Sequence, residues 1–322
     1  MEIIDKSHID TTIEAFEVIH RRSGLCAQRC NETESGTSRA EEFSAHDTPA
    51  ALRSTANTVS VISSNAADAF ASEDEVCETL VPVEHVIDIY INEILTMRVV
   101  CTPDFLPELV IGRLFTEGIV KSIDEIESVY ICEFGTRARV FLTDRTADFS
   151  RTHVETVPSC CTGNHVLNSY FTDDDAPAKV QPIEWRDEWI FSLAREFQTD
   201  SPLHKRTLGT HSCRISIADN ASASGCRIVA NCEDIGRHNA FDKAVGCALL
   251  QGIDLSKAIV YTSGRTPVDM VLKAIRAHIP ILATKAVPTD MTVSLAREFD
   301  LTLICQARPD SMKIFNDPCR NR

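Results

Sequence analysis

The sequence predicts an α/β protein in which a mainly parallel sheet with helices on both faces follows a smaller α+β domain. The first observation is that short apolar runs alternate with helical stretches in the carboxyl-terminal half. The expected strands are 228–232, 258–262, 279–283, 301–304 and, as an edge strand, 313–315. The second observation is that polar loops follow four of these runs directly. Open parallel sheets bind their ligands at such strand ends.

Residues 1–80 are predicted to be a mostly disordered acidic extension. They carry 15 acidic and 6 basic side chains, a net charge of −9, which leaves −6 of the total −15 for the remainder. The stretch 23–75 is rich in small and polar residues and has little apolar surface to bury. Apolar residues at 9, 13, 16 and 19 have helical spacing, so a short helix that binds a partner is the alternative interpretation.

Residues 81–200 are predicted to form the small α+β domain, and residues 201–322 the α/β domain that binds a ligand. Apolar runs at 86–95 and 97–101 predict a hairpin, and 126–133 with 137–142 predict a second strand pair. A helical pattern opens at Thr102-Pro103 and ends at Gly118. A clear amphipathic helix is expected at 185–198, and residues 202–213 are expected to be a polar loop.

Composition excludes several classes of function. A net charge of −15 disfavours nonspecific binding to nucleic acid or to a membrane surface. No run of about 18 apolar residues and no signal-peptide pattern occurs, so no membrane span is expected. The 13 cysteines are odd in number and irregularly spaced, which favours reduced thiols and a cytoplasmic protein.

The connection after the run 228–232 carries the motif Glu-Asp-Ile-Gly-Arg-His-Asn-Ala-Phe-Asp-Lys, residues 233–243. A helix start presents unpaired backbone amides, and Arg237, His238 and Lys243 add positive charge beside them. Glu233 and Asp234 are expected to cap amides or to orient these cations. The motif therefore predicts a loop that binds an anion. A capped helix with a surface salt-bridge network is the alternative interpretation.

Cations follow the neighbouring strands as well. Ser263, Gly264 and Arg265 come directly after the run 258–262, where glycine permits close approach of a ligand and arginine offers a fork for a phosphate. Lys285 follows the next strand, and Arg308 follows the one after it. Because parallel strands end at the same edge of a sheet, a ligand with several negative charges is predicted there.

Cys160 and Cys161 are the only adjacent cysteines, and a helix is expected to begin just after them. A helix amino terminus lowers the pKa of a thiol, and the thiolate is the attacking species in persulfide exchange. The pair is therefore a candidate for accepting and passing sulfur, with two ordinary loop cysteines as the alternative. No metal site is predicted, because the spacing of this pair from the histidines at 153 and 165 fits no standard site. His211 is expected to be structural or to face the cysteine loop.

Taken in this order, these stretches resemble the FdhD family of formate dehydrogenase accessory sulfurtransferases. The similarity covers about residues 81–315, and its most specific part is the motif at 233–243. Supporting blocks lie at 108–118, 263–265, 280–289 and 301–308. Agreement over so many separate blocks identifies the chain as a member of that family.

The resemblance implies a carrier that takes persulfide sulfur from a cysteine desulfurase. It delivers the sulfur to the molybdenum cofactor, bis(molybdopterin guanine dinucleotide), of formate dehydrogenase or a similar molybdoenzyme. The resemblance also implies a cytidine-deaminase-like carboxyl-terminal fold without zinc, and a homodimer. It assigns the persulfide to Cys160, and under the sulfur-transfer hypothesis Cys161 is the candidate resolving thiol. The cofactor-binding residues it implies are Gln306, Ala307, Arg308, Pro309, Asp310, Ser311, Arg237, His238, Ser263 and Arg265.

The cysteine loop departs from the family pattern. That pattern reads Ser-Cys-Gly-x-Cys-Gly, whereas residues 159–164 read Ser-Cys-Cys-Thr-Gly-Asn. The second cysteine therefore stands next to the first, and Gly163 occupies its usual place. Two alternatives to sulfur transfer stay open, namely a chaperone that binds the molybdenum cofactor without transferring sulfur, and a thiol oxidoreductase or metal protein. No motif indicates which molybdenum or tungsten enzyme is served.

Overall fold

The computed structural model describes residues 1–9, 11–22, 73–146, 155–157, 177–199 and 201–320. The chain divides into two compact units, one made of residues 1–14 with 80–322 and the other of residues 15–79. The larger unit contains two six-stranded sheets. The boundary predicted near residue 200 lies within this unit and stays a prediction. No helix in the described ranges has the length and apolar character needed to cross a membrane.

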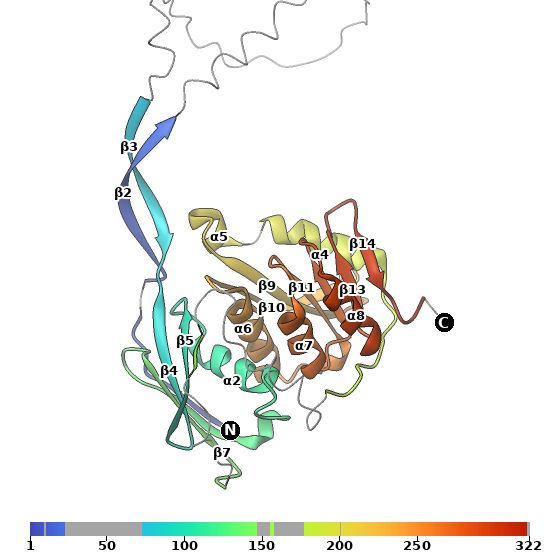
Figure 1. The fold of residues 1–322 in the computed structure, drawn as a ribbon, viewed down its shortest axis with the longest axis horizontal. Coiled ribbons are helices and arrows are strands. Elements are labelled where there is room, and N and C mark those ends of the chain that lie inside the picture. Colours follow the sequence, from blue (N-terminus) through green and yellow to red (C-terminus); the bar gives the residue numbers. More distant parts are fainter. Residues whose placement is uncertain (10, 23–72, 147–154, 158–176, 200, 321–322) are drawn as a thin grey trace, which may run out of the picture. The chain divides into compact units, whose positions relative to one another are not determined.

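The carboxyl-terminal sheet has the strand order β10-β9-β11-β12-β13-β14 (Figure 1). Its strands are β9 (His211–Ala218), β10 (Cys226–Asp234), β11 (Ala258–Thr262), β12 (Ile281–Thr284), β13 (Thr302–Cys305) and β14 (Lys313–Asn316). From the pairings, β10, β11, β12 and β13 run in the same direction, and β9 and β14 run against them. The predicted mainly parallel sheet is confirmed. Its specific cytidine-deaminase-like topology stays a prediction.

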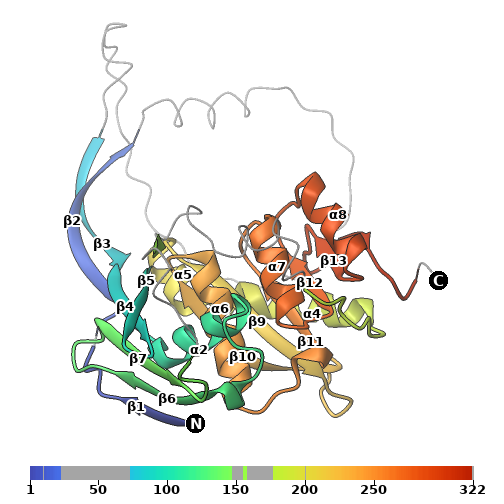
Figure 2. The same ribbon diagram turned by 60° about the horizontal axis from the view of Figure 1, so that its bottom comes forward.

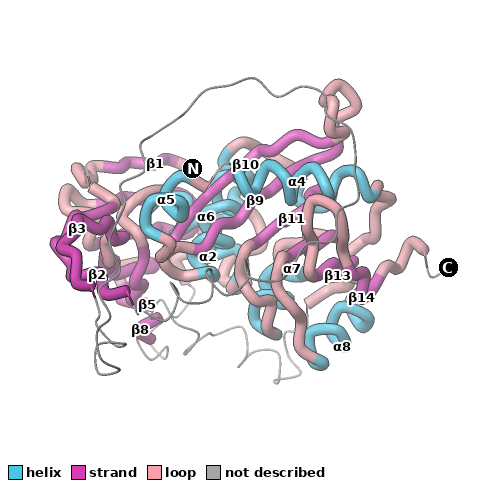
Figure 3. The backbone as a smooth tube through the Cα atoms, turned by 90° about the horizontal axis from the view of Figure 1, so that it is seen from above, coloured by secondary structure: helices cyan, strands magenta, loops and turns pink. Residues whose placement is uncertain are grey.

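Helices cover both faces of this sheet, as predicted. On one face lie α6 (Arg237–Leu250), α7 (Val268–Arg276) and α8 (Asp290–Glu298), whose apolar sides join the larger core cluster. On the other face lies α4 (Asp187–Thr199), where Trp189 and Ile190 pack in a second cluster with Ile259 and Tyr261 of β11. Figure 3 shows α4 on the opposite side of the strands from α7 and α8.

The other sheet of the larger unit has the order β1-β6-β7-β4-β5-β8. Its strands are β1 (Glu2–Asp5), β4 (His85–Ile91), β5 (Ile94–Cys101), β6 (Ile126–Ile131), β7 (Arg137–Leu142) and β8 (Glu155–Val157). Both predicted strand pairs, β4 with β5 and β6 with β7, are antiparallel. Asn92 and Glu93 turn the first hairpin with φ of 47° and 70°, the left-handed values of a tight hairpin turn.

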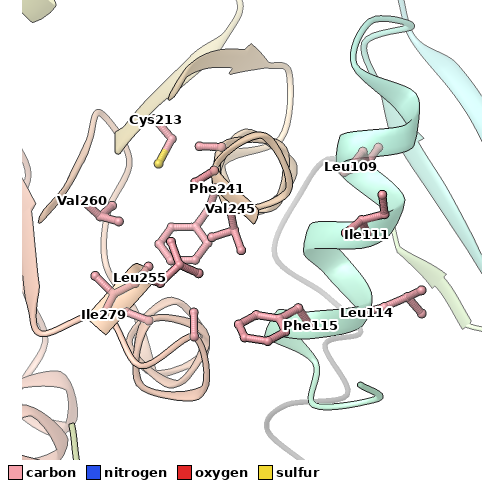
Figure 4. Close-up of a cluster of buried hydrophobic side chains, with 14 of the residues drawn as sticks. Leu109, Ile111, Leu114, Phe115, Cys213, Phe241, Val245, Leu255, Val260 and Ile279 are labelled. Carbon is pink, nitrogen blue, oxygen red and sulfur yellow. The ribbon is translucent and has the colours of Figure 1, made fainter. Parts of the chain in front are cut away.

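Helix α2 (Leu106–Thr116) lies between the two sheets, next to α6 (Figure 2). Figure 4 shows Phe115 of α2 pointing toward the helices of the carboxyl-terminal sheet, while Leu114 points the other way. The approach of α2 to α6 requires two glycines. A Cβ on Gly112 would lie 1.8 Å from the backbone oxygen of Asp242, and one on Gly246 would lie 1.9 Å from that of Glu108. One continuous apolar core therefore joins both sheets.

A buried cluster of charges fixes the same helices to one another. Lys273 of α7 contacts Asp242 of α6 and Glu117 just after α2, each at 2.9 Å. Arg113 of α2 lies 3.3 Å from both carboxylates. All four side chains are buried. Because each charge has an opposite partner, attraction within the cluster offsets the desolvation penalty of burying these charges.

The structure corrects two predictions about local structure. Within residues 1–80, β1, β2 (Ile13–Arg22) and β3 (Glu73–Pro82) are strands, with β2 and β3 in a two-stranded sheet. The predicted disorder and the alternative helix are therefore wrong for these segments, and residues 23–72 lie outside the described ones. The polar loop expected at 202–213 contains the helix α5 (Pro202–Thr207) and the start of β9. Both errors concern elements whose partners lie far away in the sequence.

Single 3-10 turns occur at Ile123–Glu125 and Leu255–Lys257.

Candidate anion-binding site

The polar side chains of the 233–243 motif hold the fold together. The Lys243 ammonium lies 2.7 Å from Asp234 Oδ2 and donates to Thr102 Oγ1 at 2.7 Å. Asp234 Oδ1 accepts from the Gly236 amide at 2.8 Å and from the Asn239 side chain at 3.0 Å. The expectation that Lys243 supplies charge for a ligand is therefore wrong, because this ammonium is fully buried within the protein. Burial opposes its charge, but Asp234 and Asp104 outweigh that effect and raise the pKa of Lys243.

Glu233 positions α5. Its two carboxylate oxygens accept hydrogen bonds from the backbone amides of Leu203 at 2.9 Å and His204 at 2.8 Å. These amides belong to the first turn of α5, where donors have no partner within the helix. The Glu233 residue as a whole is 8% exposed. The predicted capping role of Glu233 thus occurs on a different helix from the one that follows it in sequence.

A cavity of about 520 Å³ opens at the carboxyl ends of β11, β12 and β13, between these strand ends, α4 and α5. Its lining residues are Ala194, Phe197, Gln198, Ser201, His204, Lys205, Tyr261, Ser263, Lys285, Ala286, Ala307, Arg308 and Pro309. Among these described residues four can carry positive charge and none is acidic. A cavity of this size and charge suits a small anionic molecule.

Two buried threonines hold the loops at the base of the cavity. Thr262 Oγ1 accepts from the Gly264 amide at 3.2 Å, and Thr284 Oγ1 donates to the Gly264 carbonyl at 2.7 Å. Thr284 Oγ1 also accepts from the Ala286 amide at 3.0 Å. The backbone after β11 and β12 is thereby fixed, so Ser263 and Lys285 leave the sheet at defined positions.

Phe197 of α4 organises the cations on one wall. The Arg214 guanidinium lies 5.1 Å from the centroid of its ring, and the Lys285 ammonium lies 5.6 Å from it. The Tyr261 ring packs against Phe197 at 5.0 Å between centroids. Such contacts attract cations to an aromatic face without neutralising them. Phe197 therefore holds the Lys285 ammonium at the cavity, where this charge can still bind an anion.

The ionisation of Lys285 is also tuned by its surroundings. Burial first, and then the positive charge of Arg308, lower the pKa of the Lys285 ammonium. The Arg308 guanidinium donates to the Lys285 carbonyl at 2.6 Å and to its own neighbour, the Ala307 carbonyl, at 3.1 Å. Tyr261 Oη donates to the same Ala307 carbonyl at 2.9 Å. A bound anion would relieve the repulsion between the two cations.

His211 joins the edge of this site through Ser263. The Ser212 amide donates to Ser263 Oγ at 3.0 Å, and His211 Nδ1 lies 3.3 Å from the same oxygen. Burial lowers the pKa of His211, and the charges of Arg237, His204 and Lys285 lower it further. The imidazole is consequently neutral near pH 7. The structure thus places it among cations, and any relation to the cysteine loop stays a prediction.

The structure brings together some of the predicted cofactor-binding residues and separates others. Ser263, Ala307, Arg308 and Pro309 line the cavity. An adjacent hollow of about 320 Å³ is lined by a second group, Gln306, Arg308, Ser311, Met312 and Lys313. The side chains of Arg265 and Asp310 are exposed and line neither of these two.

Arg237 and His238 begin α6 and are buried rather than open to the cavity. Arg237 packs its side chain against Gly264, where an added Cβ would lie 2.9 Å from the Arg237 Cβ. His238 Nε2 lies 2.7 Å from the Asp269 carboxylate. Among the described residues no carboxylate forms an ion pair with Arg237, and its Nε has no hydrogen-bond partner. Arg237 and His238 therefore support the loop after β11 without lining the cavity.

Sequence reasoning missed the walls contributed by α4 and α5. The amphipathic pattern at 185–198 predicts only an apolar helix face for Phe197, and the polar loop predicted at 202–213 includes His204 and Lys205. The signal for α5 was available, because Pro202 at the first helical position and a cation-rich end are typical of a short helix. No local signal indicates that Phe197 meets Lys285, since they come from different layers of the fold.

The predicted sulfur site lies outside the described residues. Cys160, Cys161, His153 and His165 all belong to the ranges 147–154 and 158–176. Their roles therefore stay predictions. Within the ranges that the structure does describe, no group of three or more His, Cys, Asp or Glu side chains is arranged to hold a metal ion.

The fold and cavity define an α/β protein with a cationic cavity at the strand ends of its carboxyl-terminal sheet. The chain belongs to the FdhD/NarQ family, whose sequence model matches residues 82–322. It is 30% identical over 245 residues to the sulfur carrier protein FdhD of Listeria monocytogenes serotype 4b, covering 74% of this chain and 90% of the relative. It is 32% identical over 225 residues to that of Staphylococcus haemolyticus, covering 69% and 82%.

A solved structure agrees with this assignment. The chain resembles a formate dehydrogenase accessory protein from Desulfotalea psychrophila with a TM-score of 0.58 and 27% sequence identity. The similarity covers 77% of this chain and 93% of that one. The family match begins at residue 82, so β1, β2 and most of β3 precede it.

Proposed function

We propose that this protein is a sulfur carrier for formate dehydrogenase or a similar molybdoenzyme. In this proposal a cysteine desulfurase transfers sulfur to Cys160 as a persulfide, and the protein passes it to a bound molybdenum bis(molybdopterin guanine dinucleotide). The molybdenum cofactor is here a substrate. The observation that carries the proposal is a cationic cavity, with no acidic side chain among its described lining residues, in a chain of the FdhD/NarQ family.

The chemistry of the cavity supports binding of a guanine dinucleotide. Its pyrophosphate groups need several positive charges, which Lys205, Lys285 and Arg308 supply. Its planar rings need an aromatic wall, which Phe197 and Tyr261 supply. We expect Ser263 and the 306–311 segment to contact the cofactor, with Arg237 and His238 supporting the loops that bind it.

Strand β8, which precedes the cysteine loop in the sequence, lies near the beginning of α6. Val157 of β8 pairs with Val99 of β5, and the Val100 carbonyl accepts a hydrogen bond from the Asn239 side chain at 2.7 Å. Cys160 follows Val157 by three residues, a chain length of at most about 11 Å. We therefore propose that Cys160 acts beside the helix start that holds Arg237 and His238. Positive charge there would favour a thiolate at Cys160.

We further propose that the protein works in the cytoplasm as a homodimer. Cys161 is assigned as a thiol that resolves or shares the persulfide. The irregular spacing of the 13 cysteines supports a reducing compartment.

A cofactor chaperone that transfers no sulfur is the second candidate. It is favoured by one observation, the adjacency of Cys160 and Cys161 where the family pattern separates its two cysteines. The Cys161 thiolate can attack the inner sulfur of a Cys160 persulfide, so that its S–S bond breaks, a Cys160–Cys161 disulfide forms and the sulfur is lost as hydrosulfide. The cavity would remain functional in such a protein.

Mass spectrometry of the intact protein distinguishes the two candidates. The full-length protein is incubated with a cysteine desulfurase and cysteine, beside Cys160→Ala and Cys161→Ala. Sulfur transfer predicts a mass gain of one sulfur that a thiol reductant reverses and that disappears in Cys160→Ala. If the wild type gains no sulfur but still binds a guanine nucleotide, the chaperone replaces the sulfur carrier as the proposed function.

A binding measurement tests the cavity separately. Calorimetric titration with a guanine nucleotide should detect binding that is lost in Lys285→Met and retained in Lys257→Met. Lys257 is a matched control because it is exposed and lies outside the cavity. Equal binding by both variants would show that the guanine nucleotide occupies another site.

A further inference from the structure

Two thiols outside the proposed site are in contact. Cys232 Sγ of β10 lies 3.5 Å from Cys247 Sγ of α6. Both cysteines are reduced in this structure. Neither residue lines the cavity, and neither belongs to the segments assigned to sulfur transfer.

The surrounding structure holds the two sulfurs together. Strand β10 is the edge of its sheet, and α6 packs along it. The Gln251 side chain, at the end of α6, donates to the Val229 carbonyl of β10 at 2.8 Å. On the other side of α6, Gly246 lies directly against the backbone of Glu108 in α2. The helix therefore cannot easily move away from the strand.

The two thiols differ in access to solvent. Cys232 is 1% exposed, whereas Cys247 is only partly buried. Contact with Cys247 and burial both raise the pKa of Cys232. An oxidant from solvent would therefore meet Cys247 first, with Cys232 as a neighbouring thiol behind it.

We propose that Cys232 and Cys247 form a reversible disulfide when the protein is exposed to hydrogen peroxide. The Cys247 thiolate attacks the peroxide, the O–O bond breaks, and the sulfur becomes a sulfenic acid while hydroxide leaves and takes up a proton. The Cys232 sulfur then attacks the Cys247 sulfur, the S–O bond breaks and the S–S bond forms. The hydroxide leaves with the Cys232 proton as a second water. Two electrons pass from the thiols to the peroxide.

Proximity compensates for the low thiolate content of Cys232. Its sulfur already touches the atom that it must attack, which gives the second step a high effective concentration. The ring closed by this bond contains residues 233–246, including Arg237 and His238. Oxidation would thus tie together the two elements that flank the family motif. The inference does not depend on the proposed sulfur transfer.

Peptide mapping tests the proposal directly, because trypsin separates the relevant cysteines. Cys232 lies alone in the fragment 228–237 and Cys247 alone in the fragment 244–257. Full-length protein is treated with hydrogen peroxide, denatured in the presence of N-ethylmaleimide so that buried free thiols are also blocked, and digested without reductant. We expect these two fragments to be joined with the loss of two hydrogens, and to separate after dithiothreitol.

Three variants sharpen the test. Cys247→Ser should abolish the linked fragment. Cys232→Ala should replace it with a sulfenic acid on the 244–257 fragment, which dimedone traps. Cys226→Ser is the matched control and should retain the link, because Cys226 is on the same strand but packs in the other core cluster. Loss of the link in Cys226→Ser would contradict the proposed pair.

An internal standard shows that the oxidant was effective. Cys132, partly exposed, lies alone in the tryptic fragment 122–137. Burial acts to raise the pKa of Cys132, but hydrogen bonds from Thr136 and from backbone amides outweigh it, so its pKa is lowered. If Cys132 is oxidised while both Cys232 and Cys247 still react with N-ethylmaleimide, the proposal is wrong.

Discussion

The Lys243 ammonium lies 2.7 Å from the Asp234 carboxylate, and both side chains are fully buried. The pair joins the end of β10 to the second turn of α6. Through Thr102 and Asp104 it also fastens the segment before α2. The charged residues of the family motif therefore serve largely to hold the two sheets together.

Removing the Lys243 charge should strongly destabilise the protein. Lys243→Met leaves Asp234 buried without its partner, which typically costs about 3–5 kcal/mol. Urea denaturation of the full chain measures this loss. Lys257→Met, which removes an exposed lysine paired with Asp254, should leave the urea midpoint nearly unchanged. Similar midpoints for both variants would mean that the buried pair contributes little.

A methyl group at the crossing of α2 and α6 should also destabilise the fold. In Gly112→Ala the new Cβ would lie 1.8 Å from the Asp242 carbonyl oxygen, so the helices must separate, at a cost of about 1–3 kcal/mol or more. Gly252→Ala is the control, since φ is +69° there but nothing lies within 4 Å of the added Cβ. It should cost only about 1 kcal/mol. Thermal unfolding that ranks Gly252→Ala as the more harmful would contradict the close crossing.

Glu233→Gln should weaken anion binding even though the Glu233 side chain makes no direct contact with the ligand. The amide nitrogen of glutamine cannot accept a hydrogen bond, so one of the two amides at the start of α5 loses its partner. We expect roughly a tenfold weaker binding of a guanine nucleotide, about 1.4 kcal/mol. Faster hydrogen exchange at Leu203 and His204 would report the loosened helix itself. The control is Glu188→Gln, which removes an exposed carboxylate from α4 and should change neither measurement.

The affinity for anions should fall as the pH rises. This fall should begin at a lower pH than the deprotonation of an ordinary lysine would give. Burial and Arg308 lower the pKa of Lys285, so its ammonium deprotonates below the usual value of about 10.4. An anion binds the ammonium, and affinity is therefore highest below the lowered pKa and falls above it. Titrations of nucleotide affinity against pH should show this fall in the wild type over a pH range below the ordinary lysine pKa of about 10.4. In Lys285→Arg the affinity should stay constant over that range, and parallel curves would exclude Lys285 as the titrating group.

Much of the fold follows from local patterns in the sequence. The runs at 228–232, 258–262 and 301–304 are β strands because apolar residues between turn signals can be buried only in a covered sheet. The prediction failed where pairing is distant. Strand β2 pairs with β3 across a separation of 50 residues, and β1 adds to β6 in parallel. Neither strand pairing produces a periodic pattern of apolar residues in the sequence.

The candidate site shows the same division. Placement of Ser263, Lys285 and Arg308 at one sheet edge follows from the order of parallel strands, which the sequence determines by itself. The sequence also determines the family, because its motifs are contiguous. Only the tertiary structure decides that Lys243 is buried in an ion pair, that Glu233 caps α5, and that Phe197 faces Lys285. Those roles depend on which distant side chain completes a charge or a hydrogen bond, and residue type alone cannot specify that partner.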